Sequence, residues 1–201
     1  FKKLHSDIQE KLVFFNITLP STFQTASIPF IKSGTNVYCN AQKDSGKTTT
    51  LVLTTLQRLK CEALGNAPRA LVLVENKERA MELYNLFLAY TKYNSLRVYV
   101  GHEQLHIDIQ KSEIFEGTDI LISTPKTMNK LFLLNGVNTA QLKIISIDDA
   151  EFLSQHSSYS AIMSISQSIQ KCQYVIYSEK STSMLKRFES YFMEHSKIVS
   201  F

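Results

Sequence analysis

The chain has 201 residues, of which 44% are hydrophobic and 20% are charged. The length fits one large α/β domain better than two small ones, and the composition is ordinary for a globular protein with a sizeable core. No apolar run approaches the ~18 residues of a membrane span and no signal peptide is evident, so a membrane partner is not expected. The formal net charge of +4 permits contact with a polyanion without requiring it.

The cysteines indicate the redox environment that we expect for the chain, and the first residue indicates whether we expect a fragment. Cys39, Cys61 and Cys172 lie far apart and form no Cys-x-x-Cys pair, which disfavours a zinc site or a redox motif. An odd number of cysteines favours reduced thiols inside a cell. The chain begins at Phe1 rather than Met, so we expect a fragment of a longer protein.

Short apolar runs alternate with helix-length segments along the whole chain. Most runs are continuous rather than alternating, as expected for parallel strands covered on both faces. No repeat, low-complexity run or linker interrupts them, which predicts a single domain over residues 1–201. The predicted strands cover residues 37–39, 70–74, 97–100, 119–123, 143–147, 174–178 and 197–199.

Two segments between these runs carry apolar stripes at helical spacing. Strands that alternate with helices predict βαβ units, and therefore a three-layer α/β domain with a mainly parallel sheet of about seven strands. The first stripe is Val52, Leu56, Leu59 and Ala63, and the second is Ala80, Leu83, Tyr84, Phe87 and Leu88.

Residues 41–48 lie between the first strand and the first striped helix, where a phosphate-binding loop belongs. Backbone N–H groups at a helix N-terminus point at an anion, and the helix dipole favours negative charge there. Lys47 would reach the β- and γ-phosphates, and the Thr48 hydroxyl would hold Mg²⁺. Ala41 stands where the loop pattern has its first Gly, and the Asp44 carboxylate would repel phosphate oxygens unless Lys43 or the metal offsets it.

An acidic pair ends the run at 143–147. After a phosphate loop, such a pair indicates a metal site, with Asp148 steadying Mg²⁺ and Asp149 polarising the attacking water. The alternative is an acid-rich helix N-terminus, which the helix dipole favours without any metal.

The order of these features resembles the first RecA-like domain of the DEAD-box RNA helicases over nearly the whole chain. Residues 20–24 resemble the Q motif, whose glutamine, here Gln24, reads adenine, and Phe1 resembles the upstream aromatic residue that stacks on the base. Residues 41–48 resemble motif I. By this resemblance, ATP with Mg²⁺ is the cofactor, and the residues expected to bind it are Phe1, Gln24, Ala41, Ser45, Gly46, Lys47, Thr48 and Thr49.

Further motifs follow in the order of that family. Residues 70–80 resemble a strand and turn ending in Pro-Thr-Arg-Glu-Leu-Ala, residues 117–125 resemble the strand before Thr-Pro-Gly-Arg, and residues 148–151 take the place of Asp-Glu-Ala-Asp. RNA would lie across the strand ends through backbone contacts. Thr124 and Pro125 also fit a plain helix start, and Lys77 a solvated helix residue. The residues that the resemblance assigns to RNA are Lys77, Glu78, Gly101, Thr124, Pro125 and Lys126.

Several motifs depart from the family pattern, which predicts weak or absent hydrolysis and unwinding. Asp149 shortens the water-activating glutamate by one methylene, Asp44 replaces a loop glycine, and Glu179 with Lys180 replaces part of Ser-Ala-Thr. The catalytic residues expected are Lys47, Asp148 and Asp149. The second RecA-like domain, which supplies arginine fingers in this family, is absent from the sequence, so we expect it in the parent chain.

The resemblance divides the chain into a Q-motif region at 1–35 and a core at 36–201. Two interpretations stay open: an ATP-dependent RNA helicase, or a helicase-like module that binds RNA or proteins without cycling. Another P-loop ATPase, such as a kinase or transporter, is disfavoured because Gln24 and residues 122–125 have no role there. We expect an intracellular setting, in the cytoplasm or a ribonucleoprotein granule, with protein partners. A Tudor-domain protein of a small-RNA pathway is one candidate parent.

Overall fold

Seven strands form one parallel sheet in the computed structural model, which describes residues 1–169 and 171–201. The strand order across the sheet is β3-β4-β2-β5-β6-β1-β7, and every neighbouring pair is parallel. All seven runs predicted from the sequence are confirmed as strands. They are β1 (Val37–Asn40), β2 (Ala70–Leu73), β3 (Val98–Gly101), β4 (Ile120–Ser123), β5 (Ile144–Ile147), β6 (Gln173–Ser178) and β7 (Lys197–Ser200).

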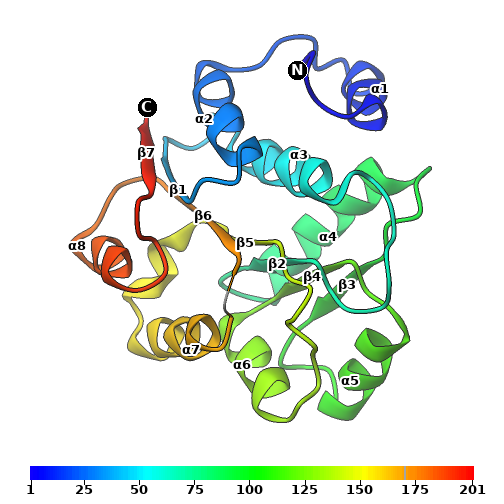
Figure 1. Ribbon diagram of the computed structural model, residues 1–201, viewed down its shortest axis with the longest axis vertical. Coiled ribbons are helices and arrows are strands. Elements are labelled where there is room, and N and C mark those ends of the chain that lie inside the picture. Colours follow the sequence, from blue (N-terminus) through cyan, green and yellow to red (C-terminus); the bar gives the residue numbers. More distant parts are fainter. Residues whose placement is uncertain (170) are drawn as a thin grey trace.

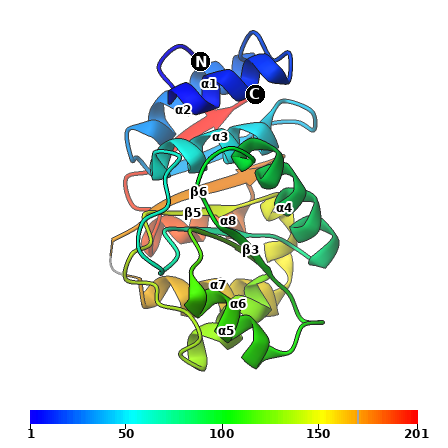
Figure 2. The same cartoon turned by 90° about the vertical axis from the view of Figure 1, so that its right-hand side faces the viewer.

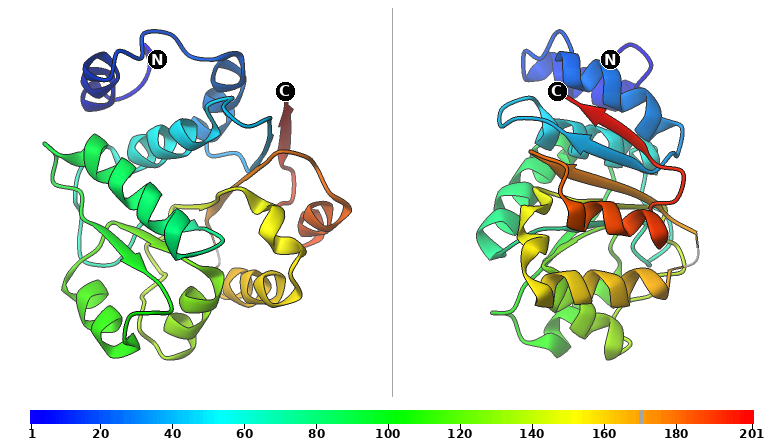
Figure 3. Two further views of the ribbon diagram at one scale, coloured as in Figure 1. Left: turned by 180° about the vertical axis from the view of Figure 1, so that it is seen from behind. Right: turned by 90° about the vertical axis from the view of Figure 1, so that its left-hand side faces the viewer.

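Helices cover both faces of the sheet, which confirms the three predicted layers (Figures 1 and 2). One face carries α1 (Ser6–Phe14), α2 (Thr22–Lys32), α3 (Lys47–Leu59) and α4 (Lys77–Thr91). The other carries α5 (Ile107–Glu116), α6 (Pro125–Leu133), α7 (His156–Gln167) and α8 (Ser183–Lys186), with short 3₁₀ turns η1 (Ala150–Ser154) and η2 (Arg187–Ser190). From behind and from the side, the strands run between the two groups of helices (Figure 3). No helix in the described ranges is long and apolar enough to cross a membrane.

The central strands β2 and β4 are buried along their whole length because each of their faces meets a separate core. On β2, Val72 packs with the α1–α4 face, whereas Leu71 and Leu73 pack with the α5–α8 face. On β4, Ile122 packs with the α1–α4 face, and Leu121 packs with the α5–α8 face. Side chains of a strand alternate between its faces, so a strand covered on both sides needs apolar residues at every position.

The first striped helix is shorter than predicted. Helix α3 ends at Leu59 because Lys60 adopts a left-handed conformation with φ of 57°, and Cys61 follows it at φ of 54°. The prediction that Ala63 continues the stripe is therefore wrong. On α4, Leu83 and Phe87 are buried as predicted, but Leu88 is 40% exposed, so the stripe is narrower than the spacing suggests.

An ion triad around a buried carboxylate joins the starts of three neighbouring strands. Asp119, fully buried just before β4, accepts hydrogen bonds from Arg69 Nη2 at 2.7 Å and from Arg97 Nε at 2.8 Å. Arg69 precedes β2 and Arg97 precedes β3. Arg97 and Asp119 were expected inside strands, but they lie one residue before them and fasten that edge of the sheet.

Candidate functional site

The predicted site residues gather at one edge of the sheet. In a parallel sheet all the strands end at the same edge, and the loops that follow them meet there. The loop after β1 and the acidic pair after β5 are separated only by the end of β6, since these strands lie in the order β5-β6-β1. The geometry therefore brings Lys47, Thr48, Asp148 and Asp149 into one cluster. They line, or lie beside, a cavity of about 550 Å³.

The loop between β1 and α3 has the shape that an anion site needs. Gly46 at its end has φ of 96°, and no side chain caps the first turn of α3. Uncapped N–H groups at a helix N-terminus attract negative charge. Ser45 Oγ is buried without a hydrogen-bond partner, while Ala41 is fully buried and holds the loop against the sheet.

The Lys47 side chain is folded back onto its own loop. Its Nζ donates to the carbonyl oxygens of Ala41 at 2.6 Å and of Ser178 at 3.4 Å, and lies 3.7 Å from Asp149 Oδ1. The ammonium group is buried, so these carbonyl oxygens replace its hydration shell. The Lys47 ammonium is therefore held beside the loop, in the wall of the cavity.

Asp44 lies in the wall of the cavity, as its place in the loop suggested. Its φ of 63° is left-handed, a conformation that favours glycine over other residues. The carboxylate is exposed and shares the cavity wall with Lys43 and Thr49. The departure from glycine at position 44 thus adds both backbone strain and negative charge to this site.

Gln24 connects helix α2 to the phosphate loop. Its Oε1 accepts from the backbone N–H of Ser21, which completes a capping box, and its Nε2 donates to the Gly46 carbonyl oxygen at 3.4 Å. Ser21 Oγ donates to the Ser45 carbonyl oxygen at 2.8 Å. Gln24 also lines a largely apolar cavity of about 1020 Å³ together with Phe1. The two residues expected to hold adenine therefore border one cavity.

The acidic pair is split between a buried and an exposed carboxylate. Asp148 is buried, and its Oδ1 has no hydrogen-bond partner. Asp149 has φ of 45° and ψ of 63°, and about half of its side chain is exposed. Next to them, Glu151 accepts a hydrogen bond from the backbone N–H of Glu179, which joins the acidic segment to the end of β6.

Arg79 is the residue of this site that the sequence analysis missed. Its Nε donates to Asp148 Oδ2 at 2.6 Å, and its Nη2 donates to Thr48 Oγ1 at 2.9 Å. Nη2 also lies 3.8 Å from Asp149 Oδ2. The sequence alone carried no signal for this contact, since Arg79 and Asp148 meet only because β2, which precedes Arg79, pairs with β5, whose end carries Asp148.

Arg79 and Asp148 each favour the charged form of the other. Burial raises the pKa of the Asp148 carboxyl, and the hydrogen bond from Arg79 opposes that rise. Burial by itself would lower the pKa of the Arg79 guanidinium, but the hydrogen bond and the charge of Asp148 raise it above its ordinary value. The guanidinium is therefore a permanent cation at this position.

Thr48 and Asp148, the residues expected to hold Mg²⁺, do not fit that ion as they stand. Oxygen atoms of both accept hydrogen bonds from the one guanidinium of Arg79, which fills the place between them. A cation there would have to displace Arg79. The expected metal site is thus arranged around an organic cation.

The six residues expected to contact RNA lie at the ends of β2, β3 and β4, which are neighbours in the sheet. Lys77 Nζ donates to Gln104 Oε1 at 2.6 Å, and Lys126 is exposed. Gly101 is buried, and a Cβ added there would lie 2.7 Å from Gln110 Oε1. Glu78 is exposed on the first turn of α4. The arrangement brings both basic side chains to the same edge as the phosphate loop.

Thr124 and Pro125 begin helix α6, as the alternative interpretation of this segment predicted. Thr124 Oγ1 accepts from the Thr127 N–H, and Pro125 occupies the first helical position. The same hydroxyl donates to Glu103 Oε1 at 2.6 Å. Glu103, which the sequence analysis did not single out, therefore adds a negative charge beside Lys126, with which it lines a small cavity.

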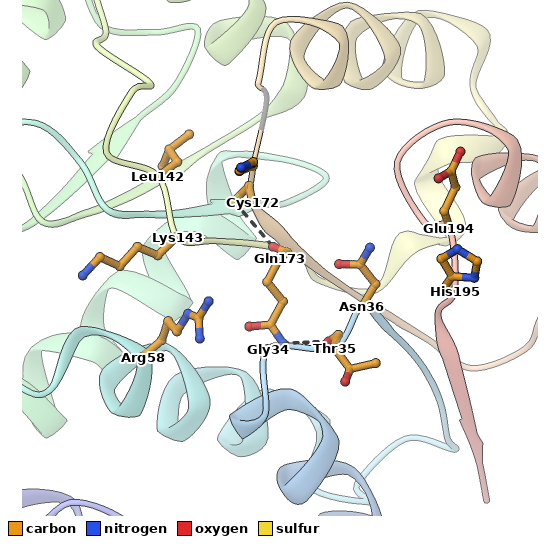
Figure 4. Close-up of a pocket in the computed structure, with 11 residues that line it drawn as sticks. Gly34, Thr35, Asn36, Arg58, Leu142, Lys143, Cys172, Gln173, Glu194 and His195 are labelled. Carbon is orange, nitrogen blue, oxygen red and sulfur yellow. Dashed lines mark hydrogen bonds between the residues drawn. The ribbon is translucent and has the colours of Figure 1, made fainter.

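A separate cavity of about 610 Å³ lies at the opposite edge of the sheet, where the strands begin (Figure 4). The Gln173 amide, at the start of β6, donates to the carbonyl oxygens of Ile31 and Thr35 at 2.7 Å each. Asn36 ties the same region together through the backbone N–H of Tyr174. These contacts fasten α2 to the sheet, so we interpret this cavity as structural.

Comparisons with known proteins agree on one family. The family model described as "DEAD/DEAH box helicase" matches residues 21–184. The pre-mRNA-processing ATP-dependent RNA helicase PRP5 of Candida albicans is 30% identical over 155 residues, covering 74% of this chain and 17% of the relative. The DEAD-box ATP-dependent RNA helicase 16 of Arabidopsis thaliana is 26% identical over 213 residues, covering 98% of this chain and 33% of the relative.

A solved structure agrees in fold. The crystal structure of a DEAD box protein from the hyperthermophile Methanococcus jannaschii superposes with a TM-score of 0.89 at 15% identity. The alignment covers 98% of this chain and 55% of that one. This chain therefore has the fold of a RecA-like DEAD-box domain and spans only part of the length of the proteins it matches.

Proposed function

Because this chain belongs to the DEAD/DEAH box helicase family, we propose that it is an adenine-nucleotide-binding and RNA-binding domain of a DEAD-box-type protein. One observation carries the proposal. The uncapped phosphate loop, the Gln24 contact to that loop and the basic strand ends at Lys77 and Lys126 all lie at a single edge of the sheet. Nucleotide and RNA would bind side by side along this edge.

For the nucleotide, each part of ATP has a counterpart in the chain. The phosphates would meet the N-terminus of α3 and the Lys47 ammonium, which is already buried beside the loop. The adenine would lie between Gln24 and Phe1, which border the same cavity. Thr48 and Asp148 could hold Mg²⁺ only if Arg79 left the place between them.

For RNA, the chain offers contacts to the sugar-phosphate backbone of the RNA rather than contacts that read its bases. Lys77 supplies positive charge at the start of α4, and Lys126 supplies it on the first turn of α6, beside the N-cap Thr124. Contacts of this kind bind single-stranded RNA without regard to sequence.

Hydrolysis by this domain is slow in our proposal. Asp149 is held near Lys47 and Arg79 in a left-handed conformation, and its side chain is one methylene shorter than the family's glutamate. A displacement of ~1 Å at a reacting group can cost ~10²-fold in rate. A second RecA-like domain would have to close over this edge to complete a hydrolytic site. Without that closure the domain serves as a helicase-like module that binds RNA or proteins.

The proposal is tested by two titrations of this chain. A fluorescent adenine nucleotide should bind with a Kd in the micromolar-to-millimolar range and lose at least ~10-fold in affinity in Lys47→Ala, since one charge-assisted contact is removed. Single-stranded RNA should lose affinity in the Lys77→Ala/Lys126→Ala double variant, with a shallower salt dependence.

Lys143→Ala is the matched control for RNA, because Lys143 is exposed at the opposite edge of the sheet, where β5 begins. Equal loss of RNA affinity in the control and in the double variant would reject the proposed RNA edge. Equal nucleotide affinity of Lys47→Ala and wild type would reject the nucleotide site.

A further inference from the structure

We propose that Arg79 is the resident cation of the nucleotide site, so that the phosphates of a nucleotide bind here without a divalent ion. The inference rests on the nucleotide binding proposed above and adds the identity of the cation. A guanidinium on the protein would do the electrostatic work that a metal ion does in a site of this kind.

The first argument is position. The guanidinium joins Asp148 Oδ2 at 2.6 Å to Thr48 Oγ1 at 2.9 Å, and these are the oxygen atoms between which a metal would be held. A planar guanidinium can bridge two acceptors at once because its N–H groups form a rigid fork. A divalent ion and Arg79 therefore cannot occupy this position together.

The second argument is that Arg79 is needed where it is. The Asp148 side chain is fully buried, and Arg79 is the only cation within 4 Å of it among the described residues. A buried carboxylate without a counter-charge is strongly destabilising. If Arg79 moved away without replacement, Asp148 would be left in that state. The ion pair therefore favours keeping the guanidinium in the site.

The third argument is that Arg79 still has donors to offer a ligand. Its Nη1 donates to Glu82 and its Nη2 to Thr48, and each nitrogen keeps another N–H without a hydrogen-bond partner in the described part of the chain. The side chain is 26% exposed and lines the cavity beside the phosphate loop. Guanidinium N–H groups are well suited to phosphate oxygens.

The charge of the cavity wall agrees with this assignment. Three cationic and three carboxylate side chains line it, so the wall is formally neutral with Arg79 in place and becomes negative without it. A negative wall would repel phosphates unless a metal were recruited. These side chains are Lys43, Lys47, Arg79, Asp44, Asp149 and Glu179.

The test is the affinity of the wild-type chain for ADP and ATP, measured by calorimetry in excess Mg²⁺ and again in excess EDTA. We expect the two affinities to agree within about threefold. In Arg79→Gln, which can still donate a hydrogen bond to Asp148, affinity in EDTA should fall about tenfold, the effect of losing one charge-assisted contact, and Mg²⁺ should restore it. Arg187→Gln is the matched control, because Arg187 is exposed on η2 at the other face of the sheet.

The wild-type comparison decides the question even if Arg79→Gln does not fold. Nucleotide binding that requires Mg²⁺ in the wild type overturns the inference but leaves the proposed function standing. Absence of nucleotide binding in both conditions overturns both. Binding that appears only in Arg79→Gln also overturns the inference, since Arg79 would then block the site.

Binding of Mn²⁺, followed by electron paramagnetic resonance, gives a second readout. With ADP present, the wild type should immobilise no more Mn²⁺ than ADP alone does, and Arg79→Gln should immobilise more. Equal immobilisation by the two proteins, above the level of free ADP, would mean that a metal enters despite Arg79 and would overturn the inference.

Discussion

The Gln24 amide nitrogen lies 3.4 Å from the carbonyl oxygen of Gly46, so the end of the phosphate loop rests directly on helix α2. A Cβ at position 46 would come within 2.8 Å of that nitrogen. The glycine is thus required twice, for its φ of 96° and for the close approach of Gln24.

Gly46→Ala should therefore impair folding and nucleotide binding together. We expect a loss of more than about 1 kcal/mol in the free energy of unfolding, since backbone strain and displacement of Gln24 add. Gly65→Ala is the matched control, because Gly65 also has a positive φ, of 65°, but has no atom within 4 Å of an added Cβ. Urea unfolding measures both variants, and equal losses would argue against the Gln24 contact.

Asp44 should limit nucleotide affinity through its charge. We expect Asp44→Asn, which tolerates the left-handed backbone, to raise the affinity for ADP by a few-fold, because a carboxylate is removed from the cavity wall. Asp44→Gly should bind ADP as well as Asp44→Asn does. It should also gain about 1 kcal/mol in the free energy of unfolding, because glycine adopts the positive φ without steric strain. Asp108→Asn, an exposed change on α5, serves as control. Unchanged affinity in Asp44→Asn would show that Lys43 already offsets the charge.

Glu103 should weaken RNA binding. It accepts a hydrogen bond from Thr124 and lines a cavity with Lys126, so its charge lies where RNA phosphates are proposed to bind. Glu103→Gln should raise RNA affinity by a few-fold at low salt, and the gain should shrink as salt screens the charge. Fluorescence anisotropy with a short RNA measures this. Glu116→Gln, an exposed change at the far end of α5, should have little effect, and a similar gain there would count against the proposed edge.

Asp119 should govern the acid stability of the domain. Burial raises the pKa of its carboxyl, but hydrogen bonds from Arg97 and Arg69 more than offset that effect and hold the pKa below its ordinary value. Its contribution to stability is thus fully present above the unfolded-state pKa of about 3.9, and it is lost as the pH falls through the lower folded-state pKa.

Asp119→Asn should accordingly lower the free energy of unfolding at neutral pH by about 3–5 kcal/mol, since two arginines lose their buried partner. The gap between variant and wild type should narrow as the pH falls below about 4. Urea unfolding at neutral pH and at a pH below about 4 measures the difference in the free energy of unfolding, with Asp108→Asn as an exposed control. A gap that stays constant with pH would contradict the role of the triad.

Much of the fold follows from local patterns, because the central strands must be apolar on both faces and most of the described α-helices begin at a side-chain cap. The runs at β2 and β4 were predictable for this reason, and so was the start of α6 at Thr124. The end of α3 was not, because it depends on the left-handed Lys60 rather than on apolar spacing.

The site was predictable where a motif sets both sequence and geometry, as in residues 41–48. Arg79 and Glu103 were missed because no motif assigns them to the site. Arg79 lies 69 residues from Asp148 in the sequence, and the two meet only because β2 and β5 are neighbours in the sheet. No local pattern records such a meeting.

The first turn of α4 carries Lys77 and Arg79 only two residues apart, fixed by the hydrogen bond from the Arg79 N–H to Asn76 Oδ1 at 2.9 Å. Lys77 faces the proposed RNA edge, and Arg79 holds Asp148 and Thr48. One turn thus contributes to both proposed binding sites. An RNA that shifts this turn also shifts the cation beside the nucleotide, and thermodynamic reciprocity then requires the nucleotide to change RNA affinity by the same factor. The turn would make this domain an allosteric unit with a coupling element of only a few residues.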